Sequence, residues 1–425
     1  MQETDEGRKT AGPVGAPGAG LVAADAPAPR GTRLASVASS FALERNVVAV
    51  SLAMLLMALG EELWKRFMPK YLEALGAPVL AVGLYGSARD LLDGLYQYPG
   101  GWVADRNGRR HALLLFVALA AVGYATYLAA PSWPLVFVGL VFVMAWSSMA
   151  SPALFAVIGD ALPRERRAMG FTVQSILRRV PIAVAPTVGG ILIVTHGVRD
   201  GVRVGLVAAL GLAGLTLVVV WRLRVPLVPP AAPTGIVGVW RALPRPLRWL
   251  LASDVFVRTC EGLVVVFVVL FVTSVLGLSA PQFGALVAVQ MVTSILAYVP
   301  AARLADRGGR KPFVVATFLA FSFFPLAIVV AEGLGGLVAA FVVGGLREIG
   351  EPARKALIVD LATPHLRARS VGLYYLVRSL AVAPAATIGA ALWNVTPAAP
   401  FLAAAAVGLA GTIVFVATVR ASDTT

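Results

Sequence analysis

Residues 101–110 read GWVADRNGRR, and residues 302–311 repeat them as ARLADRGGRK. A proline precedes each copy, Pro99 in the first and Pro300 in the second, and each copy joins two long apolar stretches. Further residues recur at a shift of about 200: Glu61 and Glu261, Pro152 and Pro352, Asp160 and Asp360, Arg178 and Arg378. A repeat that keeps its register over this distance predicts two structurally related halves.

The composition excludes a soluble protein. Of the 425 residues, 58% are hydrophobic and only 14% are charged, whereas soluble domains carry about 25% charged residues. The net charge of +14 comes from basic residues in short loops between apolar stretches, which is typical of a membrane protein rather than of a nucleic-acid-binding surface. The single cysteine, Cys260, allows no intramolecular disulfide and no cysteine-based metal site, and we expect no metal and no cofactor.

Apolar stretches long enough to cross a hydrocarbon core of about 30 Å as helices follow one another along the chain. There are twelve: 46–72, 78–101, 111–130, 134–158, 168–194, 204–221, 248–276, 281–303, 313–331, 335–359, 370–393 and 400–419. They are too long and too continuously apolar for the strands of a β-barrel. The sequence therefore predicts an all-α membrane protein with twelve transmembrane helices in two pseudo-symmetric six-helix bundles.

The bundles are expected at 46–221 and 248–420. A proline-rich linker at 222–247 joins them, residues 1–45 form a disordered tail, and 421–425 form a second tail. Loops on the side of the amino-terminal tail hold Arg106, Arg109, Arg110, Arg164, Arg166, Arg167, Arg303, Arg307, Arg310, Lys311, Arg367 and Arg369, and those on the other side hold only Arg199 and Arg203. Because cytoplasmic loops are rich in Lys and Arg, linker and termini should be cytoplasmic, with the chain in the cell (inner) membrane.

At the repeated loop the chain resembles the major facilitator superfamily of secondary transporters, over roughly residues 45–420. The family's loop motif G-x-x-x-D-R-x-G-R-R is complete in the first half, at Gly101, Asp105, Arg106, Gly108, Arg109 and Arg110. The second copy retains Asp306, Arg307, Gly309 and Arg310 and departs from the motif at Ala302. The resemblance implies transport by alternating access, with Asp105 docking near the start of the eleventh helix and latching one conformation.

A second, partial resemblance concerns the direction of transport. Residues 185–190, APTVGG, look like the G-P-x-x-G-G motif of proton-coupled exporters, with Ala185 in place of the first glycine. This match favours an exporter. Proline and glycine can equally serve kinks and close packing of membrane helices.

Charged residues interrupt the apolar stretches, and ionisable groups at such depth usually face an interior or a water-filled cavity. Six stretches carry them, whereas the third, sixth, ninth and twelfth have none in their central parts; the resemblance implies that those four face lipid. We expect the embedded charges to surround one central chamber and to serve substrate or proton coupling: Glu61, Glu62, Arg89, Asp90, Asp93, Arg178, Arg179, Asp254, Arg258, Glu261, Arg347, Glu348, Glu351 and Arg378.

Helical spacing predicts several ion pairs, because residues three or four apart share a helix face. Asp254, Arg258 and Glu261 should form one group, Arg347, Glu351 and Lys355 a second, and Arg89 should pair with Asp93. Arginines without an acidic neighbour need partners from other helices: Arg378 is expected near Asp90 or Asp93, and Arg178 or Arg179 near Gln290. The alternative to a role in transport is that these ion pairs form a static network that only holds the helices together.

These observations together predict a monomeric transporter in the lipid bilayer that exports a small organic solute in exchange for protons. Candidate proton carriers are Glu61, Glu62, Glu261, Glu348 and Glu351. Uptake or exchange of an organic anion is the alternative, because of the embedded arginines, and a non-transporting receptor with the same fold is another. We expect no enzyme, because no nucleophile–His–acid set and no phosphate-binding loop is present.

Overall fold

The computed structural model describes residues 45–151, 153–154, 157, 164–223, 240–241, 243–362 and 367–419, and all regular structure in these ranges is helical. The predicted tails and most of the predicted linker lie outside them. The first helices are α2 (Arg45–Glu62), η1 (Lys65–Phe67), α3 (Met68–Ala74), α4 (Val79–Asn107), α5 (Arg109–Ala129), α6 (Trp133–Met144), η2 (Ala145–Met149) and α8 (Arg164–Trp221). The later ones are α10 (Arg245–Val264), α11 (Val268–Leu270), η3 (Phe271–Val275), α12 (Ala280–Gly308), α13 (Lys311–Val329), α14 (Gly333–Leu346), α15 (Glu351–Leu361), α16 (Arg367–Val382), α17 (Ala385–Trp393) and α18 (Ala399–Thr418).

Each apolar stretch predicted from the sequence overlaps one or more of these helices, and the stretch at 134–158 extends beyond the described residues. Within the described residues, eight helical segments are long and apolar enough to cross a membrane: Asn46–Ala74, Arg109–Ala129, Arg179–Trp221, Arg245–Val275, Ala280–Ala297, Lys311–Val329, Ser370–Trp393 and Ala399–Thr418. Trp133–Met149 and Gly333–Leu346 are shorter apolar helices. The stretches predicted at 168–194 and 204–221 share α8, which turns at Gly197, where φ is 81°.

Several helices break close to embedded charges. The first stretch ends its α-helix at Glu62 and continues through the 3-10 turn η1 into α3. The stretch predicted at 335–359 is interrupted between Leu346 and Glu351. Irregular backbone at membrane depth is tolerated where it lies inside the protein or lines a cavity. The breaks therefore point to the polar interior.

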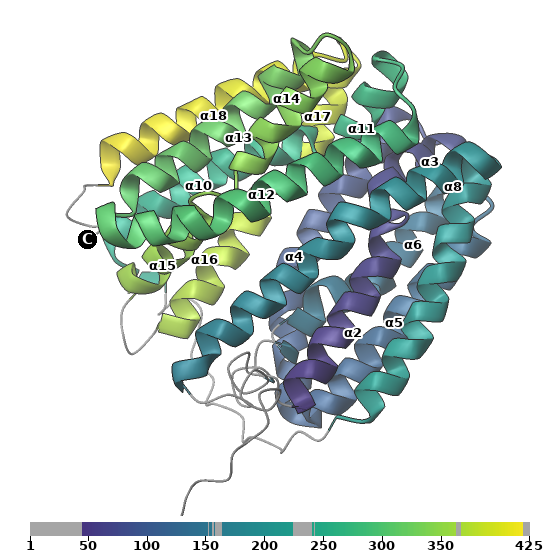
Figure 1. Ribbon diagram of the computed structural model, residues 1–425, viewed down its shortest axis with the longest axis horizontal. Coiled ribbons are helices and arrows are strands. Elements are labelled where there is room, and N and C mark those ends of the chain that lie inside the picture. Colours follow the sequence, from purple (N-terminus) through teal and green to yellow (C-terminus); the bar gives the residue numbers. More distant parts are fainter. Residues whose placement is uncertain are drawn as a thin grey trace, which may run out of the picture.

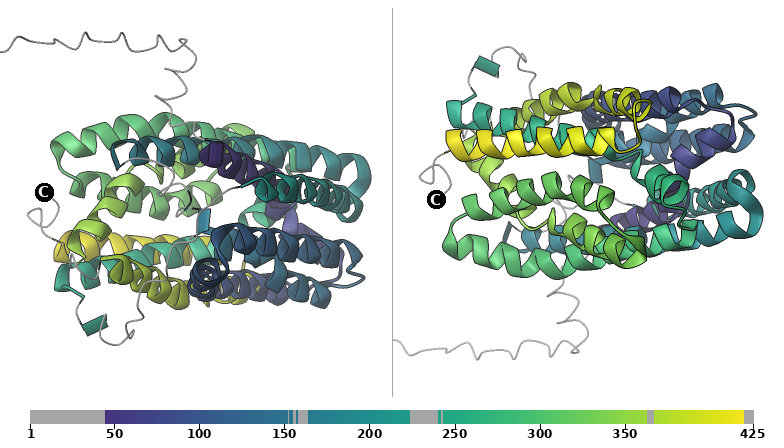
Figure 2. Two further views of the ribbon diagram at one scale, coloured as in Figure 1. Left: turned by 90° about the horizontal axis from the view of Figure 1, so that it is seen from below. Right: turned by 90° about the horizontal axis from the view of Figure 1, so that it is seen from above.

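The helices gather in two groups (Figure 1). Helices α2 to α8 form the first group, drawn in purple to teal, and α10 to α18 form the second, drawn in green to yellow. In both views of Figure 2 the second group extends to the left and the first to the right, and the two overlap in the middle. The groups meet along a seam, where α8 packs against α12, and α4 packs against α16 and α17. This seam brings together helices that are far apart in the sequence.

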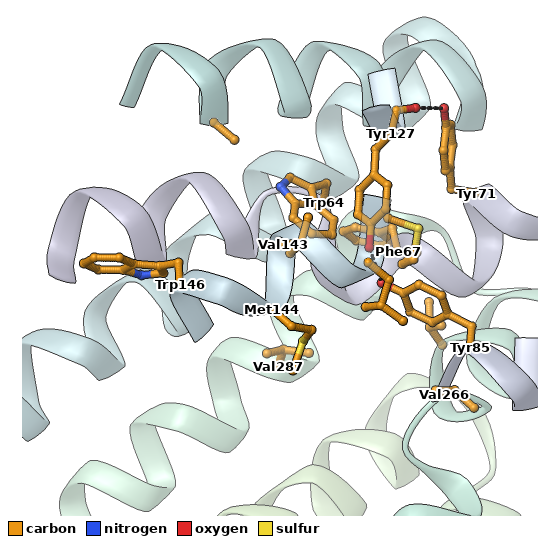
Figure 3. Packing of buried hydrophobic residues seen from close by; sticks show 14 of the residues in the cluster. Trp64, Phe67, Tyr71, Tyr85, Tyr127, Val143, Met144, Trp146, Val266 and Val287 are labelled. Carbon is orange, nitrogen blue, oxygen red and sulfur yellow. Dashed lines mark hydrogen bonds between the residues drawn. The ribbon is translucent and has the colours of Figure 1, made fainter. Parts of the chain in front are cut away.

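Aromatic side chains fill the interior of the first group. Trp64 lies edge-on to Tyr124 and Tyr127, with ring centroids 5.7 and 5.4 Å apart. The Tyr71 hydroxyl donates to the Tyr127 carbonyl over 3.0 Å, and the hydroxyls of Tyr85 and Tyr127 lie 3.0 Å apart (Figure 3). Buried tyrosines need such partners for their hydroxyl groups. The contacts fix η1 and α3, and with them the charged break in the first stretch.

Candidate functional site

A cavity of about 500 Å³ lies at the seam, with walls from α4, α8, α10, α12 and neighbouring elements of both groups. Its ionic lining comprises six basic side chains, Lys65, Arg66, Arg89, Arg179, Arg347 and Lys355, and four acidic ones, Glu62, Glu261, Glu348 and Glu351. Apolar side chains such as Phe283, Phe324 and Phe341 complete the wall. Its size and its mixed lining are typical of a small-molecule site.

The first group contributes two buried glutamates from the end of α2. Glu61 is 6% exposed and Glu62 is 8% exposed. Lys65 Nζ lies 3.3 Å from Glu61 Oε2, and Arg66 Nε lies 3.1 Å from Glu62 Oε2. Glu61 also accepts hydrogen bonds of 3.1 Å from Tyr124 and Ser147. Each glutamate thus has a basic partner one helical turn away, and Lys65 and Arg66 extend into the cavity.

The second group contributes a connected ionic network. Arg258 spans two acids: its Nη1 lies 2.9 Å from Glu261 Oε2 and its Nη2 lies 3.2 Å from Glu351 Oε2. Arg347 lies 3.5 Å from Glu261, on a different helix, rather than beside Glu351 as its spacing suggested. The break between α14 and α15 explains the difference, because it interrupts the common helix face that the prediction assumed.

Arg354 is the buried centre of this network, and the sequence prediction left it out of the site. Its side chain is 1% exposed. Nη1 lies 2.7 Å from Asp254 Oδ2, while Nη2 and Nε lie 2.6 and 2.9 Å from the two carboxylate oxygens of Glu351. Asp254 Oδ2 also accepts a 3.0 Å bond from Tyr374 and one of 3.4 Å from Arg378. The spacing of three residues from Glu351 is a signal that could have identified Arg354.

Among the side chains that the structure describes, one ion pair crosses the seam at the cavity. Arg179 Nη2 on α8 lies 3.1 Å from Glu348 Oε2 in the second group, and Arg179 Nη1 also donates to Ser294 on α12. Arg179 and Gln290 line the same cavity, and Arg179 donates to Ser294, one turn beyond Gln290 on α12. The side chain of Arg178 lies outside the described residues.

A smaller cavity of about 250 Å³ lies beside the first. Its ionic lining consists of Arg89, Asp90, Asp93, Arg258, Glu261 and Arg378. The predicted pair of Arg89 and Asp93 is wrong: Arg89 Nη2 lies 3.0 Å from Asp90 Oδ1, its neighbour in sequence. Arg378 shares this cavity with Asp90 and Asp93, as predicted, but its ion pair is with Asp254. Asp93 instead accepts a 2.6 Å hydrogen bond from Ser148.

The repeated loops have the tight geometry that their glycines permit. Gly108 has φ 80° and Gly309 has φ 86°, a region that disfavours other residues. Arg106 lies over the Trp102 ring at 5.2 Å and Arg110 over the Trp221 ring at 5.1 Å, while Arg310 pairs with Asp360. Arg109 also lies among the described residues, whereas the side chains of Asp105, Asp306 and Arg307 and the surroundings of Gly101 lie outside them. The predicted Asp105 latch therefore stays a prediction.

Glycines of the partial exporter motif lie at close helix contacts. A Cβ atom on Gly190 would come within 2.5 Å of the Ala280 carbonyl oxygen, across the seam. On Gly189 it would come within 2.0 Å of the Leu63 carbonyl oxygen. Both glycines therefore allow α8 to pack closely. In the part of the chain that the structure describes, no three His, Cys, Asp or Glu side chains are grouped as metal ligands.

Comparison with known proteins agrees with this architecture. The family model of the Major Facilitator Superfamily matches residues 50–257 and 250–425. The uncharacterized MFS-type transporter MJ1317 of Methanocaldococcus jannaschii is 21% identical over 373 residues, covering 85% of this chain and 91% of that protein. The uncharacterized MFS-type transporter YqjV of Bacillus subtilis is 24% identical over 177 residues, 41% of this chain and 43% of that protein.

Solved structures share the fold at low sequence identity. A POT family transporter in complex with 5-aminolevulinic acid has a TM-score of 0.76 at 12% identity, covering 88% of this chain and 96% of that one. The human organic anion transporter MFSD10 (TETRAN) has a TM-score of 0.63 at 19% identity, covering 87% and 99%. With the apolar helices described above, these matches identify an integral membrane protein with a transporter fold. The chain belongs to the Major Facilitator Superfamily.

Proposed function

We propose that the protein is a secondary active transporter that moves a small organic solute by alternating access and couples its export to proton entry. The observation that carries the proposal is the cavity at the seam, because ionic side chains from both helix groups line it. In this proposal the helices form two six-helix bundles of twelve membrane spans. The protein acts as a monomer in the cell (inner) membrane, with both termini in the cytoplasm.

Contacts across the seam suggest which end of the cavity is closed. Lys70 on α3 donates to Ser274 on η3, and Phe67 lies edge-on to Phe283 with ring centroids 5.8 Å apart. These residues lie at the ends of helices that the distribution of basic loops assigns to the side opposite the cytoplasm. We therefore take this conformation to be closed on that side, with the cavity reached from the cytoplasm.

The Arg179–Glu348 ion pair offers a link between solute binding and this closure. The pair joins the two groups beside the cavity, and both side chains line it. An anionic group on the solute would compete with Glu348 for the planar guanidinium of Arg179, which suits bidentate binding of carboxylate or phosphate. Displacing Glu348 would remove one tie across the seam. The solute would thereby change the relative stability of the two conformations, as transport requires.

Export in exchange for protons rests on the partial motif at residues 185–190 and on the embedded glutamates. Each candidate proton carrier, Glu61, Glu62, Glu261, Glu348 and Glu351, has a basic partner within 3.5 Å. Rocking that separates such a pair would leave a carboxylate without its counter-charge, and that carboxylate would then take up a proton. In this way, rearrangement of the ion pairs would couple proton movement to the rocking of the two helix groups.

A second candidate function, uptake or exchange of an organic anion, is favoured by the lining of the larger cavity. Six basic side chains face four acidic ones there. Surplus positive charge in a low-dielectric chamber attracts anions. Both candidates share the same chamber and the same rocking movement; they differ in the charge of the solute and in the direction of net flow.

The test uses purified protein in liposomes that contain a pH-sensitive dye. Carboxylates, amines, zwitterions and neutral compounds are added one by one under an imposed proton gradient. Proton movement that requires both the protein and one solute class would support the proposal. For that class, cells that overproduce the protein should accumulate less solute if it exports and more if it imports. If no solute class drives proton movement or exchanges across the liposome membrane, the transport proposal is wrong.

A further inference from the structure

Asp93 differs from the other embedded acids in its partner. Basic side chains pair with seven acids of the two cavities and their surroundings: Glu61, Glu62, Asp90, Asp254, Glu261, Glu348 and Glu351. In the described ranges, no basic side chain lies within ion-pair distance of Asp93. Its Oδ1 accepts a hydrogen bond of 2.6 Å from Ser148, which is 1% exposed. A neutral hydroxyl is thus the partner of this carboxylate.

This partner suits a carboxyl group that changes its protonation state. A glutamate in an ion pair must separate from its cation before a proton can replace that cation. Asp93 can gain a proton without separating any ion pair. A serine hydroxyl can donate to an ionised carboxylate and accept from a protonated one, so Ser148 can serve both forms. The smaller cavity beside Asp93 gives a proton a place of entry.

Charged groups around Asp93 come from both sides of the seam. Its own helix supplies Arg89 and Asp90, which pair with each other. From the second group, α10 supplies Arg258 and Glu261, and α16 supplies Arg378. Of the other elements packed against α4, η2, α6 and α17 have no charged residues in their sequences, whereas α5 begins with Arg109, Arg110 and His111 and α3 contains Lys70 and Glu73. Asp93 therefore shares one cavity with Arg89 and Asp90 of its own helix and with Arg258, Glu261 and Arg378 of the opposite group.

The helices are close together at this depth. A Cβ atom on Gly94, next to Asp93, would come within 2.7 Å of Ser379 Cβ, and Ser379 follows Arg378. An ionised Asp93 attracts the opposite arginines and stabilises this contact between α4 and α16. A protonated Asp93 no longer does so, and the contact weakens. Protonation at this position is thereby linked to the separation of the two groups.

We propose that Asp93, hydrogen-bonded to Ser148 beside the smaller cavity, binds the coupling proton, while the larger cavity binds the solute. The inference rests on the proton coupling proposed above and assigns that proton to a residue outside the set of glutamates named as carriers. In the proposed coupling step, the Asp93 carboxylate takes one proton from water at one side of the membrane and becomes a carboxylic acid. It returns that proton to water at the other side after the groups have rocked.

Infrared difference spectra of the full-length protein in lipid, titrated with protons alone, test the binding site. The unchanged protein should show the carbonyl band of a protonated carboxyl group that appears as the pH falls. The band should shift in frequency in Asp93→Glu, shift also in Ser148→Ala, which removes the hydrogen bond to this carboxyl group, and disappear in Asp93→Asn. Asp200→Asn is the matched control, because Asp200 lies at a helix end, 3.7 Å from Arg203 and largely exposed. A band that is the same in all variants overturns the proposal.

Distances between spin labels test the link to rocking. The labels are placed at Asn107 on α4 and at Leu304 on α12, two exposed positions, with Cys260 replaced by alanine. In the labelled parent protein the ratio of the two distance populations should change by about tenfold across the titration. Asp93→Asn should keep one ratio at every pH, while Asp200→Asn should follow the parent. If the populations in Asp93→Asn change with pH as they do in the parent, the link between Asp93 and rocking is wrong.

Neither measurement uses a solute, so its failure is distinct from failure of the transport proposal. If liposomes show solute-driven proton movement but the band does not depend on Asp93, the proton site lies elsewhere and the proposed function stands. If the band belongs to Asp93 but no solute class moves protons or exchanges, the proposed function fails and the proton-binding assignment stands. Should Asp93→Asn fail to fold, the frequency shift in Asp93→Glu decides the assignment.

Discussion

Replacing Arg354 with methionine should strongly destabilise the second helix group. Methionine has a similar length but cannot pair with an acid. The side chain is 1% exposed and makes three bonds shorter than 3 Å to Asp254 and Glu351. Removing one partner of a buried ion pair costs about 3–5 kcal/mol, because the remaining charge stays buried without compensation.

The surroundings of Arg354 place the expected value within that range. After the substitution Glu351 still has Arg258 at 3.2 Å, and Asp254 still has Arg378 at 3.4 Å. These partners compensate part of the loss, so we expect about 3 kcal/mol, roughly a hundredfold in the unfolding equilibrium. Lys355→Met is the matched control. Lys355 is 57% exposed and lies 3.8 Å from the same Glu351, so it should cost at most about 1 kcal/mol.

Denaturant unfolding in mixed micelles, followed by circular dichroism, measures both variants. Asp254→Asn combined with Arg354→Met should cost at least about 1 kcal/mol less than the sum of the two single changes, since the pair is then removed as a unit. If Arg354→Met costs no more than Lys355→Met, the buried network is not a determinant of stability. The assignment of Arg354 as its centre would then be wrong.

Three further predictions concern the seam, the loop and the glutamates. Arg179→Glu and Glu348→Arg should each lower the free energy of unfolding by about 1 kcal/mol or more, and the charge-swapped double variant should recover that loss. If Arg179 also binds the solute, the double variant should not recover transport. Recovery of full flux would leave Arg179 only a structural role. Gly108→Ala should lower the free energy of chemical unfolding by about 1–2 kcal/mol, because φ at this position is 80°. The control Gly211→Ala, in helix α8 with open space around it, should be neutral or stabilise by up to about 1 kcal/mol. Equal effects of the two changes would argue against strain at the loop. Glu261→Gln and Glu351→Gln should each lower pH-driven flux in liposomes by tenfold or more, because each removes an ionised partner of Arg258 at the cavities. Unchanged flux in both would remove these two from the set of proton carriers.

Helical periodicity predicted part of the ionic network. The apolar stretches fall on helices, and the spacing of Arg258 and Glu261 corresponds to an observed ion pair. Spacing alone could not choose between equivalent partners. Arg354 and Lys355 lie three and four residues after Glu351, and burial of Arg354 together with its contact to Asp254 makes it the stronger partner. Contacts between helices depend on how the helices pack, and one sequence does not contain that information.

Two kinds of feature were missed for physical reasons. Helix breaks change which side chains share a face, so Arg347 pairs with Glu261 across helices instead of following its own periodicity. Neutral partners such as Tyr124, Ser148 and Tyr374 have no periodic signal that separates them from other buried polar residues. Asp93 shows the consequence: its spacing from Arg89 suggested an ion pair, whereas the folded chain gives it the Ser148 hydroxyl.

Chemical accessibility of the larger cavity tests alternating access most directly. Met291 lines the cavity, and Met291→Cys in a Cys260→Ala background gives one reactive thiol there. A membrane-impermeant maleimide should modify it from either side, in right-side-out and in inverted vesicles. Locking Lys70→Cys to Ser274→Cys by a disulfide, across the contact at one end of the seam, should abolish modification from that end and preserve it from the other. Modification from one side only, with or without the disulfide, would contradict alternating access and indicate that the cavity opens to a single side.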